Sequence, residues 1–144
     1  MKDIGKQPVR VLMIEDNRGD VVLVREAVAK AGLAYRLTVV PDGVEAMEYL
    51  RRRGKHADAP RPDLIILDLK LPKKGGWEVL DDIRPDPTLN GLPVVLLSSS
   101  VSELEIAQSH RRPNERCIVK PSTFEGYVTA VRTMDEFRGK VAGT

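Results

Sequence analysis

Three carboxylates and one amine directly follow apolar stretches that have the length of strands: the acids Glu15, Asp16 and Asp68 and the lysine Lys120. An ionised carboxylate at the end of an apolar strand is costly unless a cation meets it there. Carboxylates that cluster raise one another's pKa unless they bind a cation. If the fold brings these strand ends together, the residues predict a cation-binding site with one ammonium beside it.

The segments between these residues determine whether the strand ends meet. Apolar stretches alternate with longer segments of helical periodicity, and several stretches lack polar alternation, as in strands covered on both faces. We expect strands at 9–14, 35–40, 64–67, 93–97 and 117–119. We expect helices at 20–31, 43–53, 77–83, 102–112 and 123–138, the fourth opened by a capping box of Ser102 and Glu105. This order predicts an open, doubly wound α/β sheet, in which ligands bind at the carboxyl edge of the strands.

Composition narrows the class of protein. The 144 residues fit one domain, expected over 8–138, with flexible tails at 1–7 and 139–144. A hydrophobic content of 42% and a charged content of 31% are typical of a soluble globular protein, and no apolar run is long enough to span a membrane. The net charge of +2, from basic and acidic residues spread along the chain, is only a weak argument for nucleic acid binding, and neither nucleic acid nor a membrane is an expected partner. The lone Cys117 and the lack of a secretory signal favour the cytoplasm.

The predicted cation is Mg²⁺, which prefers oxygen ligands and usually keeps several waters. Asp16 and Asp68 are the expected ligands, together with the main-chain carbonyl of Lys70 and, through water, Glu15. A magnesium ion beside an otherwise unencumbered aspartate suits phosphoryl transfer, in which the protein positions groups and neutralises charge. Asp68 is then the expected nucleophile.

Two further residues have the chemistry to hold a phosphoryl group on Asp68. Lys120, a compact ammonium, can meet one phosphoryl oxygen, and the hydroxyl of Ser98 can donate a hydrogen bond to another. The pattern therefore predicts an aspartate that is phosphorylated, with a hydroxyl and an amine that respond to the phosphoryl group.

Four separated motifs, taken together, resemble the receiver domain of two-component response regulators. They are Glu15-Asp16, the segment 68–76 (DLKLPKKGG), Ser98 and Lys120-Pro121, and they occur in the family's order over 8–138. The segments EDNRGDVVLVREAV, DGVEAMEYL and DPTLNGLPVVLLSSS further resemble stand-alone regulators that are paired with phytochrome-type histidine kinases of bacteria and cyanobacteria.

The resemblance implies a flavodoxin-like fold of five parallel strands in the order 2-1-3-4-5, with helices on both faces. It implies that Asp68 accepts a phosphoryl group from a sensor histidine kinase, for which a bacteriophytochrome is the candidate. Glu15, Asp16, Asp68 and the Lys70 carbonyl would organise Mg²⁺, and Ser98 and Lys120 would contact the phosphoryl group. With no effector domain expected after the fifth helix, the output is expected to be a phosphorylation-dependent contact with a downstream protein.

The sequence departs from the family's pattern at several positions. Cys117 stands three residues before the lysine, where receivers usually carry Tyr or Phe, and this puts switching by an aromatic ring in doubt. Ser98 replaces the commoner threonine but keeps the hydroxyl. The segment 110–117 (HRRPNERC) is also unusual and could reshape a partner surface. A homodimer through the last two helices and the strand of Cys117 is one such contact.

Two other functions remain open on the sequence alone. A metal-dependent phosphatase of the dehalogenase type would also form an aspartyl phosphate, but it needs a second acid two residues after the nucleophile, where this chain has Lys70. A phosphorylation-independent scaffold with an idle pocket is the other alternative, and Cys117 with the unusual 110–116 loop lends it some weight.

Overall fold

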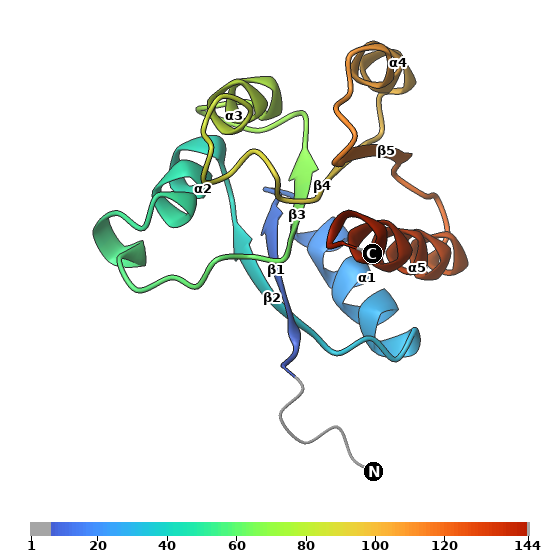
Figure 1. The fold of residues 1–144 in the computed structure, drawn as a ribbon. Coiled ribbons are helices and arrows are strands. Elements are labelled where there is room, and N and C mark those ends of the chain that lie inside the picture. Colours follow the sequence, from blue (N-terminus) through green and yellow to red (C-terminus); the bar gives the residue numbers. More distant parts are fainter. Residues whose placement is uncertain (1–6, 144) are drawn as a thin grey trace.

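A computed structural model describes residues 7–143, and its central element is a five-stranded parallel sheet with the strand order β2-β1-β3-β4-β5 (Figure 1). The flavodoxin-like α/β architecture expected from the sequence is therefore confirmed. The strands are β1 (Val9–Ile14), β2 (Tyr35–Val40), β3 (Leu64–Asp68), β4 (Val94–Ser98) and β5 (Glu115–Val119). The helices are α1 (Arg18–Lys30), α2 (Gly43–Leu50), α3 (Gly76–Ile83), α4 (Val101–Ser109) and α5 (Phe124–Val141), with a short 3₁₀ turn η1 (Gly54–His56).

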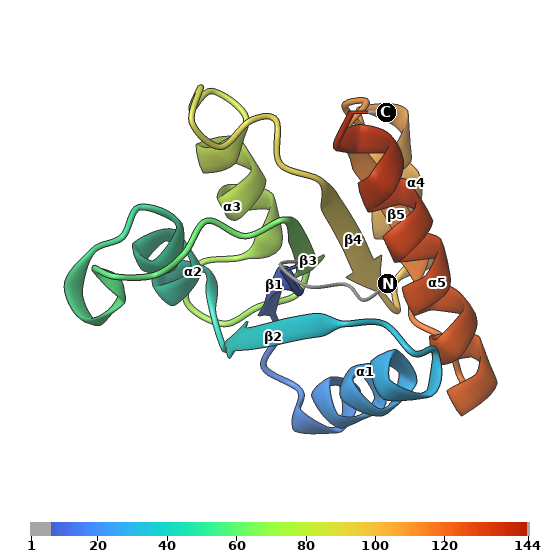
Figure 2. The same cartoon turned by 60° about the horizontal axis from the view of Figure 1, so that its bottom comes forward.

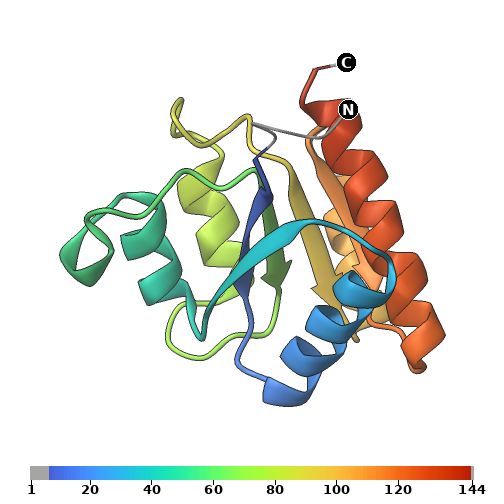
Figure 3. The same cartoon turned by 90° about the horizontal axis from the view of Figure 1, so that it is seen from below.

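The helices cover both faces of the sheet, and β2 and β5 form its two edges (Figure 2). Helices α1 and α5 pack side by side on one face, and α2 and α3 lie on the other (Figure 3). Alternate residues of β1 show this division, because Met13 packs with the α1 and α5 side chains whereas Leu12 packs with those of α2 and α3. No helix within residues 7–143 has the length and apolar character needed to cross a membrane.

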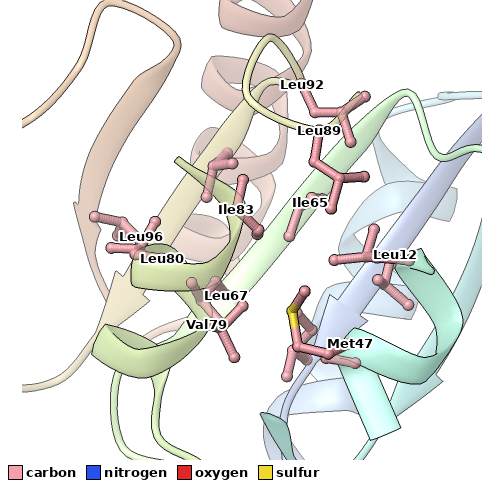
Figure 4. Close-up of a cluster of buried hydrophobic side chains, with 14 of the residues drawn as sticks. Leu12, Met47, Ile65, Leu67, Val79, Leu80, Ile83, Leu89, Leu92 and Leu96 are labelled. Atoms are coloured by element: carbon pink, nitrogen blue, oxygen red, sulfur yellow. The ribbon is translucent and has the colours of Figure 1, made fainter. Parts of the chain in front are cut away.

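The central strand β3 is buried at every position, which explains its uninterrupted apolar sequence. On the α2 and α3 face, Ile65 and Leu67 of β3 pack among Met47 of α2 and Val79 and Ile83 of α3 (Figure 4). Each fully buried side chain of this size contributes about 1.5–3 kcal/mol to folding. This packing fixes the position of the strand that carries Asp68.

Most helix boundaries differ by a few residues from those expected from the sequence, and the start of α4 and the end of α2 have clear causes. The capping box predicted at Ser102 is wrong, since Ser100 is the N-cap of α4 and accepts a hydrogen bond from the Glu103 N–H at 3.3 Å. Strand β4 runs as far as Ser98, whose Oγ accepts the Ser100 N–H and places Ser100 in an extended conformation before the helix. Helix α2 ends at Leu50 and not at 53, because the chain turns through Arg52 with a positive φ of 55°.

Helix α5 extends to Val141, beyond the predicted end at Arg138. The prediction assigned Gly139 to the tail, but the glycine with a positive φ at this end of the helix is Gly143, with a φ of 121°. The first residues of the predicted C-terminal tail are therefore helical. The predicted N-terminal tail falls outside the described residues, except for Gln7.

Two glycines allow the loop between β3 and α3 to pack closely against its neighbours. A Cβ on Gly76 would lie 2.5 Å from the carbonyl oxygen of Asp68 and 2.7 Å from Cα of Leu69. On the other side, the N–H of Gly43 in α2 donates to the Lys74 carbonyl at 3.1 Å, and a Cβ there would overlap the Lys74 backbone. The loop that follows Asp68 is thus enclosed between the sheet end and the start of α2.

Replacing Gly76 by alanine should destabilise the protein by about 1–3 kcal/mol, because the added methyl group overlaps backbone atoms that cannot rotate away. Urea unfolding would measure the loss. Gly91→Ala is the matched control, since a Cβ at Gly91 meets no atom within 4 Å. Equal stabilities of the two variants would contradict this account of the loop.

Candidate functional site

The strand register brings the sequence-predicted residues to one edge of the sheet. Asp68 pairs with Leu97 of β4, so Ser98 lies one residue further along that strand, and Ser98 itself pairs with Val119 of β5. The N–H of Lys120 donates to the Ser98 carbonyl at 2.9 Å and extends this ladder by one residue. The N–H of Glu15 likewise extends the β1–β2 ladder, donating to the Val40 carbonyl at 3.0 Å.

Three carboxylates gather at this edge. Glu15, Asp16 and Asp68 each place one oxygen within 4.8 Å of the other two. Glu15 and Asp68 are buried, with exposed fractions of 3% and 6%, whereas Asp16 is open to solvent. The Lys70 N–H donates to Asp68 Oδ1 at 3.0 Å and helps to orient that carboxylate. The predicted acidic cluster is therefore present, with one member reachable from water.

Lys120 provides the cation that the carboxylate of Asp68 needs at the end of its buried strand. Its Nζ lies 3.1 Å from Asp68 Oδ2, 3.0 Å from Glu15 Oε1 and 2.6 Å from Asp20 Oδ2. Burial lowers the pKa of the Lys120 ammonium, but its contacts with the carboxylates of Asp20, Glu15 and Asp68 outweigh burial and raise the pKa above its usual value. Lys120 is therefore charged at neutral pH.

One ammonium does not compensate all of the acids. Burial and then hydrogen bonding to Asp68 raise the pKa of Glu15 to about 7, although Lys120 acts to lower it. Glu15 Oε1 is also buried without a well-oriented hydrogen bond from any described residue, although Lys120 Nζ is near. An all-oxygen donor set with an uncompensated buried carboxylate fits a hard divalent cation such as Mg²⁺ or Mn²⁺. These residues therefore form an acidic metal-binding site.

Ser98 and Lys70 lie beside the acids. Ser98 is 1% exposed, and its Oγ accepts the Ser100 N–H at 3.1 Å, which uses a lone pair and leaves the hydroxyl proton available to donate. The Lys70 side chain is exposed, and the main-chain N–H of Lys70 donates to Asp68. The assignment of the Lys70 carbonyl to a metal stays a prediction.

Two residues of this site were missed from the sequence. Asp20, in the first turn of α1, contacts Lys120, and the Tyr127 hydroxyl on α5 donates to Asp20 Oδ1 at 3.3 Å. In the sequence Asp20 looks like an ordinary acid near a helix N-terminus, where negative charge is favourable. The available signal was its position in the first turn of the helix that directly follows β1, which keeps it near the same strand end.

Cys117 lies half-buried on β5, and burial raises the pKa of its thiol. It lines a groove of about 360 Å³ with Val101 and Leu104 of α4 and Val119 of β5. An apolar depression therefore lies between α4 and β5 beside Cys117.

Comparisons with known proteins agree with this geometry. The family model described as response regulator receiver domain matches residues 11–132. Response regulator Rcp1 of Synechocystis sp. is 34% identical over 137 residues, which cover 95% of this chain and 93% of Rcp1. The crystal structure of the Mn²⁺-bound form of Rcp1 superposes with a TM-score of 0.77 at 32% identity, covering 90% of this chain and 94% of that one.

Two further solved structures extend the likeness. The phosphorylated cyanobacterial phytochrome response regulator RcpA is 42% identical, with a TM-score of 0.80, and covers 91% of this chain and 94% of its own. The bacteriophytochrome response regulator AtBRR is 34% identical, with a TM-score of 0.76, and covers 90% of this chain and 94% of its own. The chain is therefore similar over nearly its whole length to phytochrome-associated regulators.

The raised pKa of Glu15 predicts how stability depends on pH when no divalent ion is present. The native state keeps the Glu15 proton up to a pKa of about 7, whereas an unfolded chain loses it near 4.5. The native state therefore binds more protons in this interval, and the Glu15 contribution to the free energy of unfolding, complete below pH 4.5, is lost as the pH rises through 7. The loss approaches about 3 kcal/mol.

Urea unfolding in a chelator between pH 4 and pH 8 would measure this loss as the difference between the wild type and Glu15→Gln, because the amide does not titrate. A wild-type stability that rises relative to the variant over this interval would show that Glu15 is ionised throughout.

Proposed function

Because the chain belongs to the response regulator receiver family, whose members are phosphoacceptor signalling proteins, we propose that Asp68 accepts a phosphoryl group from a histidine kinase. The observation that carries the proposal is the contact of Lys120 Nζ with the Asp68 carboxylate, 3.1 Å apart, inside the acidic cluster. We further propose Mg²⁺ as the metal in this chain, held by Glu15, Asp16, Asp68 and the Lys70 carbonyl.

In the proposed reaction, a carboxylate oxygen of Asp68 attacks the phosphorus of a kinase phosphohistidine. The new P–O bond forms as the P–N bond breaks, and the histidine nitrogen leaves with the electron pair. A bound Mg²⁺ would supply charge neutralisation on the transferring oxygens. The Lys70 N–H, 3.0 Å from Asp68 Oδ1, keeps the attacking group in a fixed orientation.

Lys120 and Ser98 are proposed to contact the phosphoryl group once it is attached. The ammonium already lies beside Asp68 Oδ2, so it can pair with a phosphoryl oxygen after a small shift. Ser98 is one residue beyond the strand partner of Asp68, and its free hydroxyl proton can reach a second oxygen. Both movements would draw the β4–α4 and β5–α5 connections toward Asp68.

The proposed phosphate source is a histidine kinase with a phytochrome-type sensor, because RcpA and AtBRR are described as phytochrome and bacteriophytochrome response regulators. Such a kinase is phosphorylated with ATP, so the reaction is proposed to occur in the cytoplasm. The proposed output is a phosphorylation-dependent contact with a downstream protein or a second copy of the chain. Val101 on α4 and Val119 on β5, 56% and 49% exposed, support a contact beside Cys117.

Incubation with Mg²⁺ and acetyl phosphate should add one phosphoryl group to the wild-type protein, detected by intact mass. Asp68→Asn should gain none, because an amide is not a nucleophile toward phosphorus. Asp81→Asn, an exposed acid on α3, is the matched control and should behave as the wild type. Chelation should abolish the gain. Equal phosphorylation of the Asp68→Asn variant would refute the assignment of Asp68.

Phosphotransfer profiling against the histidine kinases of the source genome tests the partner. We expect a kinase with a phytochrome-type sensor to transfer at least about tenfold faster than the others, a difference of about 1.4 kcal/mol in the transition state. A sensor of another class that transfers faster would overturn the proposed partner but not the role of Asp68.

A further inference from the structure

Asp20 lies outside the three-carboxylate cluster, yet it makes the shortest contact with Lys120. Its Oδ2 is 2.6 Å from Lys120 Nζ, compared with 3.0 Å for Glu15 and 3.1 Å for Asp68. Its other oxygen accepts the Tyr127 hydroxyl at 3.3 Å. Asp20 therefore joins three elements: it lies on α1, Lys120 follows β5, and Tyr127 lies on α5.

The ammonium of Lys120 has three N–H donors and three carboxylates around it. Two of them, Glu15 and Asp68, belong to the acidic metal site. If Lys120 paired mainly with those two, it would compete with a divalent ion for the same oxygens. Asp20 provides an alternative partner for the ammonium that is not in the metal cluster.

We propose that Asp20, held by Tyr127, is a positioning residue that keeps the Lys120 ammonium on the α1 side of the site and leaves Glu15 and Asp68 to the divalent ion. This inference rests on the proposed function, since it concerns the resting state of the same site. Asp20 is not proposed as a metal ligand or as a group that touches the phosphoryl donor.

Burial and charge support this role. The side chains of Asp20 and Lys120 are 19% and 13% exposed, and Tyr127 is buried at 2% exposure. Burial and then the charge of Asp20 raise the pKa of Tyr127 to about 12, so its hydroxyl keeps the proton that it donates. An ion pair shielded from water to this degree is screened less than an exposed one.

A role for Asp20 in helix initiation alone does not account for its side-chain contacts. The N-cap of α1 is Asn17, whose side chain already accepts the Asp20 N–H at 3.0 Å. The Asp20 carboxylate is instead directed at Lys120 and Tyr127. A residue that acted only on the helix dipole would not need either partner.

The test compares Asp20→Asn, Tyr127→Phe and the double variant with a matched control, Asp135→Asn. Asp135 on α5 is also partly buried, accepts a tyrosine hydroxyl (Tyr35, 2.8 Å) and pairs with a cation (Arg138, 3.0 Å), but it is not part of the acidic site. Circular dichroism and unfolding curves would establish that each variant folds.

The first readout is the Mg²⁺ dissociation constant of the unphosphorylated proteins, from the fluorescence of Trp77 next to the Gly76 contact with Asp68. Asp20→Asn should weaken binding about fivefold, since Lys120 then pairs more with Glu15 and Asp68 and one negative charge is lost. Tyr127→Phe should weaken it about twofold alone and not at all in the Asp20→Asn background. Asp20→Glu should restore most of the affinity, and Asp135→Asn should leave it unchanged.

The second readout is the ¹⁵N signal of the Lys120 ammonium in the metal-free protein, which reports its pairing directly. Asp20→Asn should shift this signal and speed its proton exchange with water. An unchanged signal would overturn the inference even if Mg²⁺ affinity fell, because a loss of charge would then suffice. If the wild type bound no Mg²⁺, the metal part of the proposed function would fail, and the ammonium signal would still decide the role of Asp20.

Discussion

Buried negative charge at one edge of a parallel sheet is the constraint on which the site depends. Glu15 and Asp68 are almost fully buried and close together, an arrangement that is costly without compensation. Lys120 provides one positive charge for three carboxylates, those of Glu15, Asp20 and Asp68, and burial raises the pKa of Glu15. The negative charge that Lys120 does not compensate is the electrostatic basis for binding a divalent ion. The same imbalance would favour an arriving phosphoryl group only when that ion accompanies it.

The sheet was predictable because its signals are local. Each central strand is apolar throughout, since helices cover both faces, and each is followed by polar residues at the edge where parallel strands end. Asp68, Glu15 and Lys120 were therefore placed together by topology alone. The predicted helix boundaries that were wrong depend on small differences. Ser100 and Ser102 are equally good N-caps by residue type, and the hydrogen bonds of Ser100 with Ser98 and Glu103 distinguish them. The end of α5 likewise depends on backbone conformation, because the positive φ occurs at Gly143 and not at Gly139.

The contact of Asp20 with Lys120 was not predictable in the same way. It joins residues a hundred positions apart, and a hydrogen bond from a third element completes it. Composition and periodicity describe what each helix buries, but α1 and α5 must first pack on the same face before their polar side chains can meet (Figure 1). Side-chain networks of this kind therefore appear only once the tertiary arrangement is known.

The enclosed loop between β3 and α3 limits which side of the site can rearrange. Its first part presses on Gly76 and its last part is bonded to Gly43, with no space for even a methyl group at either contact. If a phosphoryl group is added to Asp68, this loop has no space to move away from it. The opposite side of the site differs, because α4, which follows Ser98, borders an apolar groove with Cys117 and Val119 of β5. Under the proposed function, the rearrangement that accompanies modification of Asp68 is therefore expected in the connections to α4 and α5 and not in the loop before α3.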